Sequence, residues 1–107
     1  MKAYIKDIAY YLPEKVVTNE DLVKEFPEWS VEKIADKVGV HQRHVATDET
    51  ALDLAVQAAE KLFAKGEVLK DDIDFVMLCT QSPDYLLPTS ACIIQDRLGL
   101  SVNTGAL

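Results

Sequence analysis

Four apolar stretches along the chain predict strands or entries into strands. Residues 3–12 are rich in β-forming side chains and end at Pro13, which predicts the first strand. Residues 43–46 predict a short extended stretch, and residues 102–107 predict a loop that enters a further strand. The run within residues 74–80 is apolar without alternation, which is typical of a strand buried on both faces, as in the centre of a parallel sheet.

Capping residues mark the starts and ends of the helices between these stretches. Thr18 and Ser30 are candidate N-caps, and Thr50 is followed three residues later by an acid, as in a capping box. Gly66 stands where a helix would end, and Pro88 suits the first turn of another helix. The predicted helices span residues 19–26, 31–37, 50–65 and 88–98.

The order of these elements predicts an α/β fold with parallel crossovers, in which helices cover a mixed or parallel sheet. Residues 1–107 are at most one domain. An apolar parallel sheet needs cover on both faces, and this chain cannot supply enough of it. Because the chain also ends within an element, at Leu107, we expect it to be a fragment of a larger domain.

Composition excludes several classes of function. The net charge is -7, and no run of Lys and Arg offers a basic patch, so nucleic acid is not an expected partner. No apolar stretch approaches the length that spans a bilayer, and the first residues lack the apolar core of a secretory signal, so no membrane association is expected. Two cysteines are consistent with free thiols in a reducing, cytoplasmic setting.

The residues that could carry chemistry do not by themselves define a reaction. Cys79 lies within the apolar run and Cys92 inside a predicted helix past its first turn, so both read as structural. His41 and His44 are three apart, but two ligands make no metal site. Trp29, the only tryptophan, either stacks on a flat ligand such as an adenine or fills a small core under a loop.

Three segments, taken in order along the chain, carry a family resemblance. They are the opening Ile5–Leu22, the stretch Glu28–Trp29 with Val38–Ala46, and the segment from Ser82 to Gly99 with Pro88-Thr89-Ser90-Ala91 and Ile94-Gln95. This ordered set resembles β-ketoacyl-ACP synthase III, the initiating condensing enzyme of type II fatty acid synthesis, over the whole chain. The chain would then be the N-terminal part of a thiolase-like domain.

The resemblance implies a homodimeric acyltransferase of thiolase fold with a Cys-His-Asn catalytic set. It implies acyl-CoA and malonyl-ACP as partners, with coenzyme A thioester as substrate and no cofactor. The catalytic cysteine would lie several residues beyond Leu107, so residues 1–107 alone are expected to be inactive.

Three residues match family positions that touch substrate. Trp29 matches the residue that stacks on the CoA adenine, and Lys37 falls where the family usually has an arginine on the other face. Leu87 falls where well-known members have a phenylalanine that crosses the dimer interface into the acyl pocket. Lysine lacks the planar guanidinium, so Lys37 would meet a phosphate as a point charge.

Two alternatives remain open at this stage. One is another condensing enzyme on the same fold, such as an HMG-CoA synthase or a secondary-metabolite ketosynthase. The other is a complete small acidic module that dimerises or binds a partner without catalysis.

Overall fold

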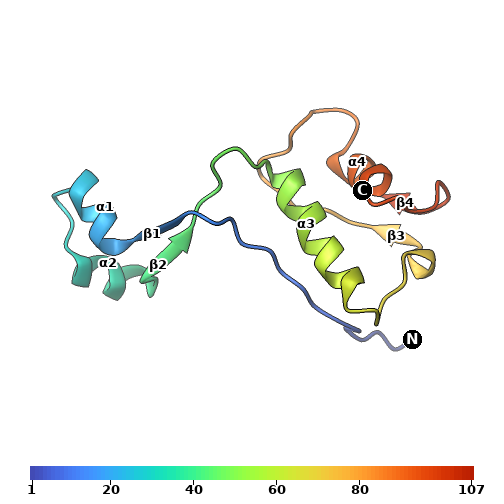
Figure 1. Ribbon diagram of the computed structural model, residues 1–107, viewed down its shortest axis with the longest axis horizontal. Helices are drawn as coiled ribbons and strands as arrows, with labels where there is room; N and C mark the ends of the chain where they lie inside the picture. Colours follow the sequence, from blue (N-terminus) through green and yellow to red (C-terminus); the bar gives the residue numbers. More distant parts are fainter. The chain divides into compact units, whose positions relative to one another are not determined.

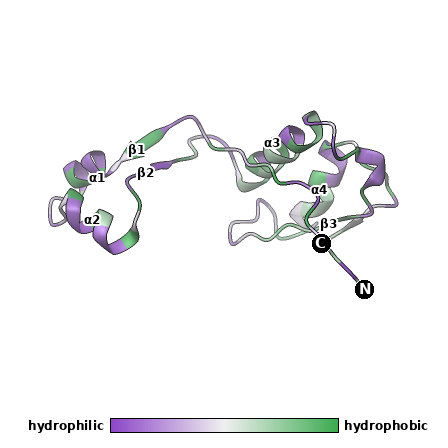
Figure 2. Ribbon diagram, turned by 90° about the horizontal axis from the view of Figure 1, so that it is seen from below, coloured by the Kyte–Doolittle hydropathy of each residue, from purple (hydrophilic) through white to green (hydrophobic).

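The computed structural model describes all residues from Met1 to Leu107, and they form two compact units (Figure 1, Figure 2). The small unit comprises residues 12–48. The large unit comprises residues 1–11 and 49–107. Each unit has its own helices and its own two-stranded sheet.

The small unit consists of two short antiparallel strands and the two helices that lie between them in the sequence. Strand β1 (Val16–Thr18) pairs antiparallel with β2 (Gln42–His44), with Val16 opposite His44. Between them lie α1 (Asn19–Glu25) and α2 (Val31–Val38). The predicted extended stretch near residue 43 is confirmed, and it pairs antiparallel with β1, a pairing that the prediction of parallel crossovers did not include.

The helices of the small unit begin and end where their capping residues predict. Thr18 accepts a hydrogen bond from the Asp21 N–H, and the Asp21 carboxylate accepts one from the Thr18 N–H, which completes a capping box. The Ser30 hydroxyl accepts a hydrogen bond from the Lys33 N–H at the start of α2. Gly39 ends α2 in the left-handed region at φ 66°, a conformation that glycine adopts without a Cβ clash.

The large unit has the predicted α/β character. Helix α3 (Ala51–Ala64) and helix α4 (Ser90–Arg97) accompany two parallel strands, β3 (Phe75–Val76) and β4 (Gly105–Ala106), and a 3-10 turn, η1 (Lys70–Asp72), precedes β3. Helix α4 lies in the crossover between the strands. The core is formed by apolar side chains from α3, from α4 and from the turn after α4: Leu52, Val56, Ile94, Leu98 and Leu100.

The strand predicted over residues 3–12 is wrong for this structure. The segment is extended but pairs with no other strand, and a strand exists only through its hydrogen-bonded partner. One side of it meets α3: Lys65 pairs with Asp7 at 2.9 Å, and Lys61 lies over the Tyr11 ring at 5.0 Å. Figure 1 shows this segment running beside α3.

Two further predictions are corrected in the second half of the chain. The run within 74–80 forms only the two-residue β3, and Met77 is exposed, because this unit offers β3 one neighbouring strand and no cover on its second face. Pro88 precedes the helix instead of opening it: Thr89 is the N-cap of α4, and the Leu87–Pro88 peptide bond is cis.

Candidate functional site

Trp29 stands between the two helices of the small unit with its side chain partly free. Its backbone N–H donates to the Phe26 carbonyl oxygen at 3.1 Å, and the residue is 39% exposed. The indole lines an apolar hollow of about 300 Å³ together with three residues from α1, its C-cap and α2: Leu22, Phe26 and Ile34. Trp29 therefore borders a small apolar cluster and still offers surface to a ligand.

Lys33, a residue that the motif did not single out, lies beside the indole. The Lys33 ammonium lies 4.7 Å from the centroid of the Trp29 ring, within cation–π range. Lys37 is exposed in the last turn of α2 and does not contact the ring. The signal that identifies Lys33 is spacing, because Trp29 and Lys33 are four residues apart across the helix start.

A buried polar network fixes the loop that follows α2. Asn19 is 1% exposed, and its side-chain amide donates to the Val40 carbonyl oxygen at 2.9 Å. Arg43 donates to the Asn19 side-chain oxygen at 2.8 Å and lies 3.5 Å from the Val17 carbonyl oxygen. Only the family motif pointed to Arg43, and nothing in the sequence pattern singled out Asn19.

Both histidines take part in hydrogen bonds within the small unit. His44 Nδ1 lies 2.6 Å from the Pro13 carbonyl oxygen, and because a carbonyl only accepts, Nδ1 carries the proton. His41 is exposed, and its carbonyl oxygen accepts from the Asn19 N–H. No group of three or more His, Cys, Asp or Glu side chains in the chain is arranged to hold a metal ion.

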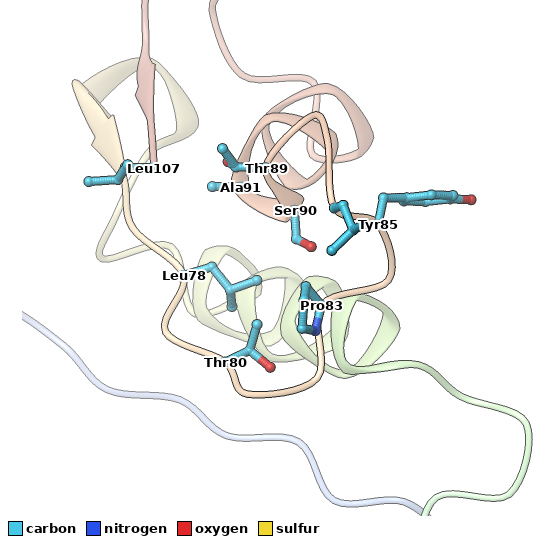
Figure 3. A pocket seen from close by; sticks show the side chains of 9 residues that line it. Leu78, Thr80, Pro83, Tyr85, Thr89, Ser90, Ala91 and Leu107 are labelled. Atoms are coloured by element: carbon cyan, nitrogen blue, oxygen red, sulfur yellow. The ribbon is translucent and has the colours of Figure 1, made fainter.

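A second pocket lies in the large unit, at the N-terminus of α4. It has a volume of about 220 Å³, and Figure 3 shows its walls: the end of β3 and the loop after it, the first turn of α4, and Leu107. The residues that line it are Leu78, Thr80, Pro83, Tyr85, Leu86, Thr89, Ser90, Ala91 and Leu107.

Leu87 does not line that pocket, but it belongs to an exposed apolar loop beside it. Leu87 is 83% exposed, and its neighbour Leu86 is 94% exposed. Tyr85, which does line the pocket, is 59% exposed. Three consecutive large apolar residues are therefore open to solvent in this unit, a pattern typical of a surface that meets a partner.

Neither cysteine lies where the sequence placed it. Cys79 is exposed, because β3 ends at Val76 and the chain leaves the sheet before reaching the thiol. Cys92 lies in the first turn of α4, since the helix starts at Ser90, and its sulfur is 3.9 Å from the Thr89 hydroxyl. Both histidines belong to the small unit, so within the large unit neither thiol has an imidazole partner.

The carboxylates with lowered pKa hold helix starts and segments in place. The Thr18 N–H and the Lys24 ammonium lower the pKa of Asp21 to about 2. The Thr50 N–H and the Arg97 guanidinium likewise lower the pKa of Asp53, which lies 2.7 Å from Arg97. A hydrogen bond from Lys65 lowers the pKa of Asp7. These groups act as structural anions and not as proton donors near neutral pH.

Comparison with known sequences identifies close relatives over most of the chain. A β-ketoacyl-[acyl-carrier-protein] synthase III of Streptococcus suis is 42% identical over 97 residues, which is 91% of this chain and 30% of the relative. The corresponding Streptococcus pneumoniae protein is 38% identical over the same share. The chain thus spans about 30% of the length of the curated relatives it matches. No family model matches the chain. None of its helices has the length and apolar character needed to cross a membrane.

Solved structures agree with the sequence relatives. A 3-oxoacyl-(acyl-carrier-protein) synthase III is 56% identical with a TM-score of 0.90, covering 96% of this chain and 31% of that one. The Pseudomonas aeruginosa 3-oxoacyl-(acyl carrier protein) synthase III is 35% identical with a TM-score of 0.83, covering 94% of this chain and 31% of that one. The thiolase-like fold class and the resemblance carried by the motifs are therefore confirmed. The chain is homologous, in sequence and in fold, to about 30% of a β-ketoacyl-[acyl-carrier-protein] synthase III.

Proposed function

We propose that the protein to which residues 1–107 belong is an acyltransferase that condenses an acyl-CoA primer with malonyl-ACP to start fatty acid synthesis. The observation that carries this proposal is the match to a solved synthase III at 56% identity and a TM-score of 0.90. Residues 1–107 form the N-terminal part of a thiolase-like domain in this proposal, and the protein acts as a homodimer.

The small unit contributes to binding coenzyme A in this proposal. The free surface of Trp29 offers an indole face to the adenine, and the apolar hollow beside it favours a flat aromatic group. Lys33 already lies against the ring, so its ammonium is available to a phosphate close to the stacked base. Lys37, exposed one turn further along α2, supplies a second positive charge.

Leu87 contributes to the acyl pocket and the dimer interface in this proposal. Its 83% exposure leaves the side chain free to enter a partner subunit. Leucine is smaller than the phenylalanine common in the family, which leaves more room for the acyl chain.

The chemistry needs a catalytic cysteine, which in this proposal lies outside residues 1–107, because neither Cys79 nor Cys92 matches the family's catalytic position. That cysteine thiolate attacks the acyl-CoA carbonyl, and coenzyme A leaves as its thiol. Malonyl-ACP then loses CO₂, and the resulting carbanion attacks the acyl-cysteine thioester. The carbon–carbon bond forms as the cysteine thiolate leaves, so no external oxidant or reductant is needed. Residues 1–107 alone have no such activity.

The test is an assay of the protein expressed from its complete reading frame. Labelled acetyl-CoA and malonyl-ACP should give labelled 3-oxobutanoyl-ACP, and Trp29→Ala should raise the KM for acetyl-CoA roughly tenfold, the loss expected for one stacked base. Trp29→Phe, which keeps a ring, should recover part of that loss. Condensation of acetyl-CoA with acetoacetyl-CoA in place of malonyl-ACP would instead favour an HMG-CoA synthase.

A further inference from the structure

Helices α1 and α2 form a pair whose two ends are held in different ways. At one end they are joined by the short connection of residues 26–30, in which the Trp29 N–H donates to the Phe26 carbonyl oxygen. At the other end the strands β1 and β2 enter and leave the pair, and no connection joins the helices there (Figures 1 and 2). That open end is held by hydrogen bonds.

Asn19, the first residue of α1, closes the open end through its backbone and its side chain. Its N–H donates to the His41 carbonyl oxygen at 3.2 Å, and its side-chain amide donates to the Val40 carbonyl oxygen at 2.9 Å. Both carbonyls belong to the loop that directly follows α2. Arg43 donates to the Asn19 side-chain oxygen at 2.8 Å, which fixes the amide with its NH₂ group toward Val40. The start of α1 thus holds the end of α2.

Apolar packing contributes little to the spacing of these two helices. Asn19 is the only buried residue of α1, and α2 has no buried residue. Leu22 and Ile34, which line the hollow beside Trp29 from the two helices, are each only half-buried. Elements with few buried apolar contacts open and shift at a small cost in free energy. The spacing of α1 and α2 therefore depends strongly on the hydrogen bonds of Asn19.

The groups that face the hollow are distributed over both helices. Leu22 belongs to α1, Ile34 and Lys33 belong to α2, and Trp29 stands between them. If the open end widened, Ile34 and Lys33 would move relative to Leu22 and the indole. Binding groups hold a ligand well only when neighbouring residues keep them in place. A ligand that touches both helices therefore depends on Asn19, although Asn19 itself is 1% exposed and cannot touch it.

We propose that Asn19 is a positioning residue for the nucleotide end of acyl-CoA: by tying the end of α2 to the start of α1, it sets the width of the hollow beside Trp29 and thereby the affinity for the nucleotide. This inference rests on the proposed function, because it takes coenzyme A as the ligand of the small unit. It adds a buried group that the ligand never contacts.

The experiment compares two acyl donors with the protein expressed from its complete reading frame. Acetyl-CoA carries the nucleotide, whereas the N-acetylcysteamine thioester of acetic acid has the same thioester without it. Asn19→Ala should raise the KM for acetyl-CoA roughly three- to tenfold, the loss expected for about one hydrogen bond, and leave its kcat within about twofold. The kcat/KM for the short thioester should stay unchanged. Lost stability alone would lower kcat/KM for both donors together, because fewer molecules would be folded.

Asn19→Asp is the second variant, because it keeps the shape of the side chain. Its carboxylate still accepts from Arg43, which favours folding, but it has no NH₂ group to donate to the Val40 carbonyl oxygen. The selective rise in the KM for acetyl-CoA should therefore appear in Asn19→Asp as well.

Thr18→Ala is the matched control. Its hydroxyl caps the same helix one residue earlier and bonds to Asp21, not to the loop after α2. Loss of this N-cap weakens the start of α1 without releasing the end of α2, so the ratio of kcat/KM for the two donors should stay unchanged. An equal change for both donors in the two Asn19 variants, or no change for either, overturns the inference. So does a selective loss of the same size in Thr18→Ala.

Calorimetric titration with coenzyme A separates this inference from the proposed function. A protein that condenses acetyl-CoA with malonyl-ACP but shows no selective loss in the Asn19 variants retains the proposed function and loses the role of Asn19. A protein that binds coenzyme A, binds it more weakly as Asn19→Ala and condenses nothing keeps the inference and loses the proposed reaction. Absence of coenzyme A binding in the unaltered protein overturns the inference.

Discussion

The side-chain oxygen of Asn19 accepts a hydrogen bond from the Arg43 guanidinium at 2.8 Å, across a separation of 24 residues. The amide of the same side chain donates to the Val40 carbonyl oxygen. Asn19 thereby ties the start of α1 to the loop after α2 and to β2. Since Asn19 is also the largest side chain in the chain that is fully buried, the small unit is organised around a polar group and not an apolar core.

Asn19→Ala should therefore destabilise the small unit more than the few atoms it removes would suggest. The substitution removes a hydrogen-bond partner from the Val40 carbonyl and from the Arg43 guanidinium, two partly exposed groups that water can partly satisfy. We expect the free energy of unfolding to fall by about 1–2 kcal/mol. Urea denaturation followed by the fluorescence of Trp29, which lies in this unit, measures it. Lys24→Ala, which removes an exposed ion pair, is the control and should change stability by less than about 0.5 kcal/mol.

Lys33, and not Lys37, should control the environment of the indole. Lys33→Met removes the ammonium 4.7 Å from the ring but keeps most of the aliphatic chain, so the emission maximum and quenching of Trp29 should change. Lys37→Met alters a side chain that does not contact the ring and should leave the spectrum unchanged. A spectral change in Lys37→Met equal to that in Lys33→Met would contradict the observed geometry.

Local capping could be predicted from the sequence because it depends on residues three positions apart. Thr18, Ser30 and Thr50 each cap the helix that follows, and each predicted helix is present within a residue or two. Strands could not be predicted in this way. The segment over residues 3–12 has strand-forming residues but no partner, and a ladder depends on a second segment that the local sequence does not specify.

The candidate site likewise contains residues that the sequence could predict and residues that it could not. Trp29 was predicted as a ligand-binding residue from its motif and stays a prediction, and the structure places it beside an apolar hollow. The resemblance pointed to Lys37 on the other face of the adenine, and that role stays a prediction. The contact of Lys33 with the Trp29 ring, four residues after Trp29, was not predicted.

Leu52 should be among the most sensitive apolar positions in the large unit. It is 2% exposed and belongs to the core cluster that joins α3 to α4. Leu52→Ala should lower the free energy of unfolding by about 3 kcal/mol, through lost burial and the cavity left behind. Leu86→Ala makes the same chemical change at a residue 94% exposed and should have an effect near zero. Thermal unfolding by circular dichroism compares them, and similar losses at both sites would contradict the assigned core.

Asp21 should make the stability of the small unit depend on pH in a defined direction. Its pKa falls from 3.8 to about 2 on folding, so the stabilisation is fully present above about pH 4 and is lost as the pH falls through about 2. Asp21→Asn removes this titration. The urea midpoint of the unaltered protein should therefore exceed that of Asp21→Asn at about pH 6, and the difference should shrink toward about pH 2. A difference that stays constant with pH would show that the carboxylate charge is not the cause.

Gly105 and Phe75 are directly opposite partners in the parallel ladder of β3 and β4. The Phe75 ring covers Gly105, and a Cβ at that position would overlap the ring atoms Cδ2 and Cε2. Gly105→Ala should then force the ring aside and cost about 1–2 kcal/mol, limited because Phe75 is 56% exposed and has room to move.

Gly105→Ala should change from destabilising to stabilising once the Phe75 ring is removed. Gly105 does not have a positive φ, so alanine fits the backbone there. In a Phe75→Ala background, Gly105→Ala should stabilise by about 0.5 kcal/mol, because alanine loses less chain entropy on folding than glycine. A double-mutant cycle by urea denaturation measures this coupling. If the cost of Gly105→Ala were equal in both backgrounds, the glycine would be required for the path of the chain and not for the approach of the Phe75 ring.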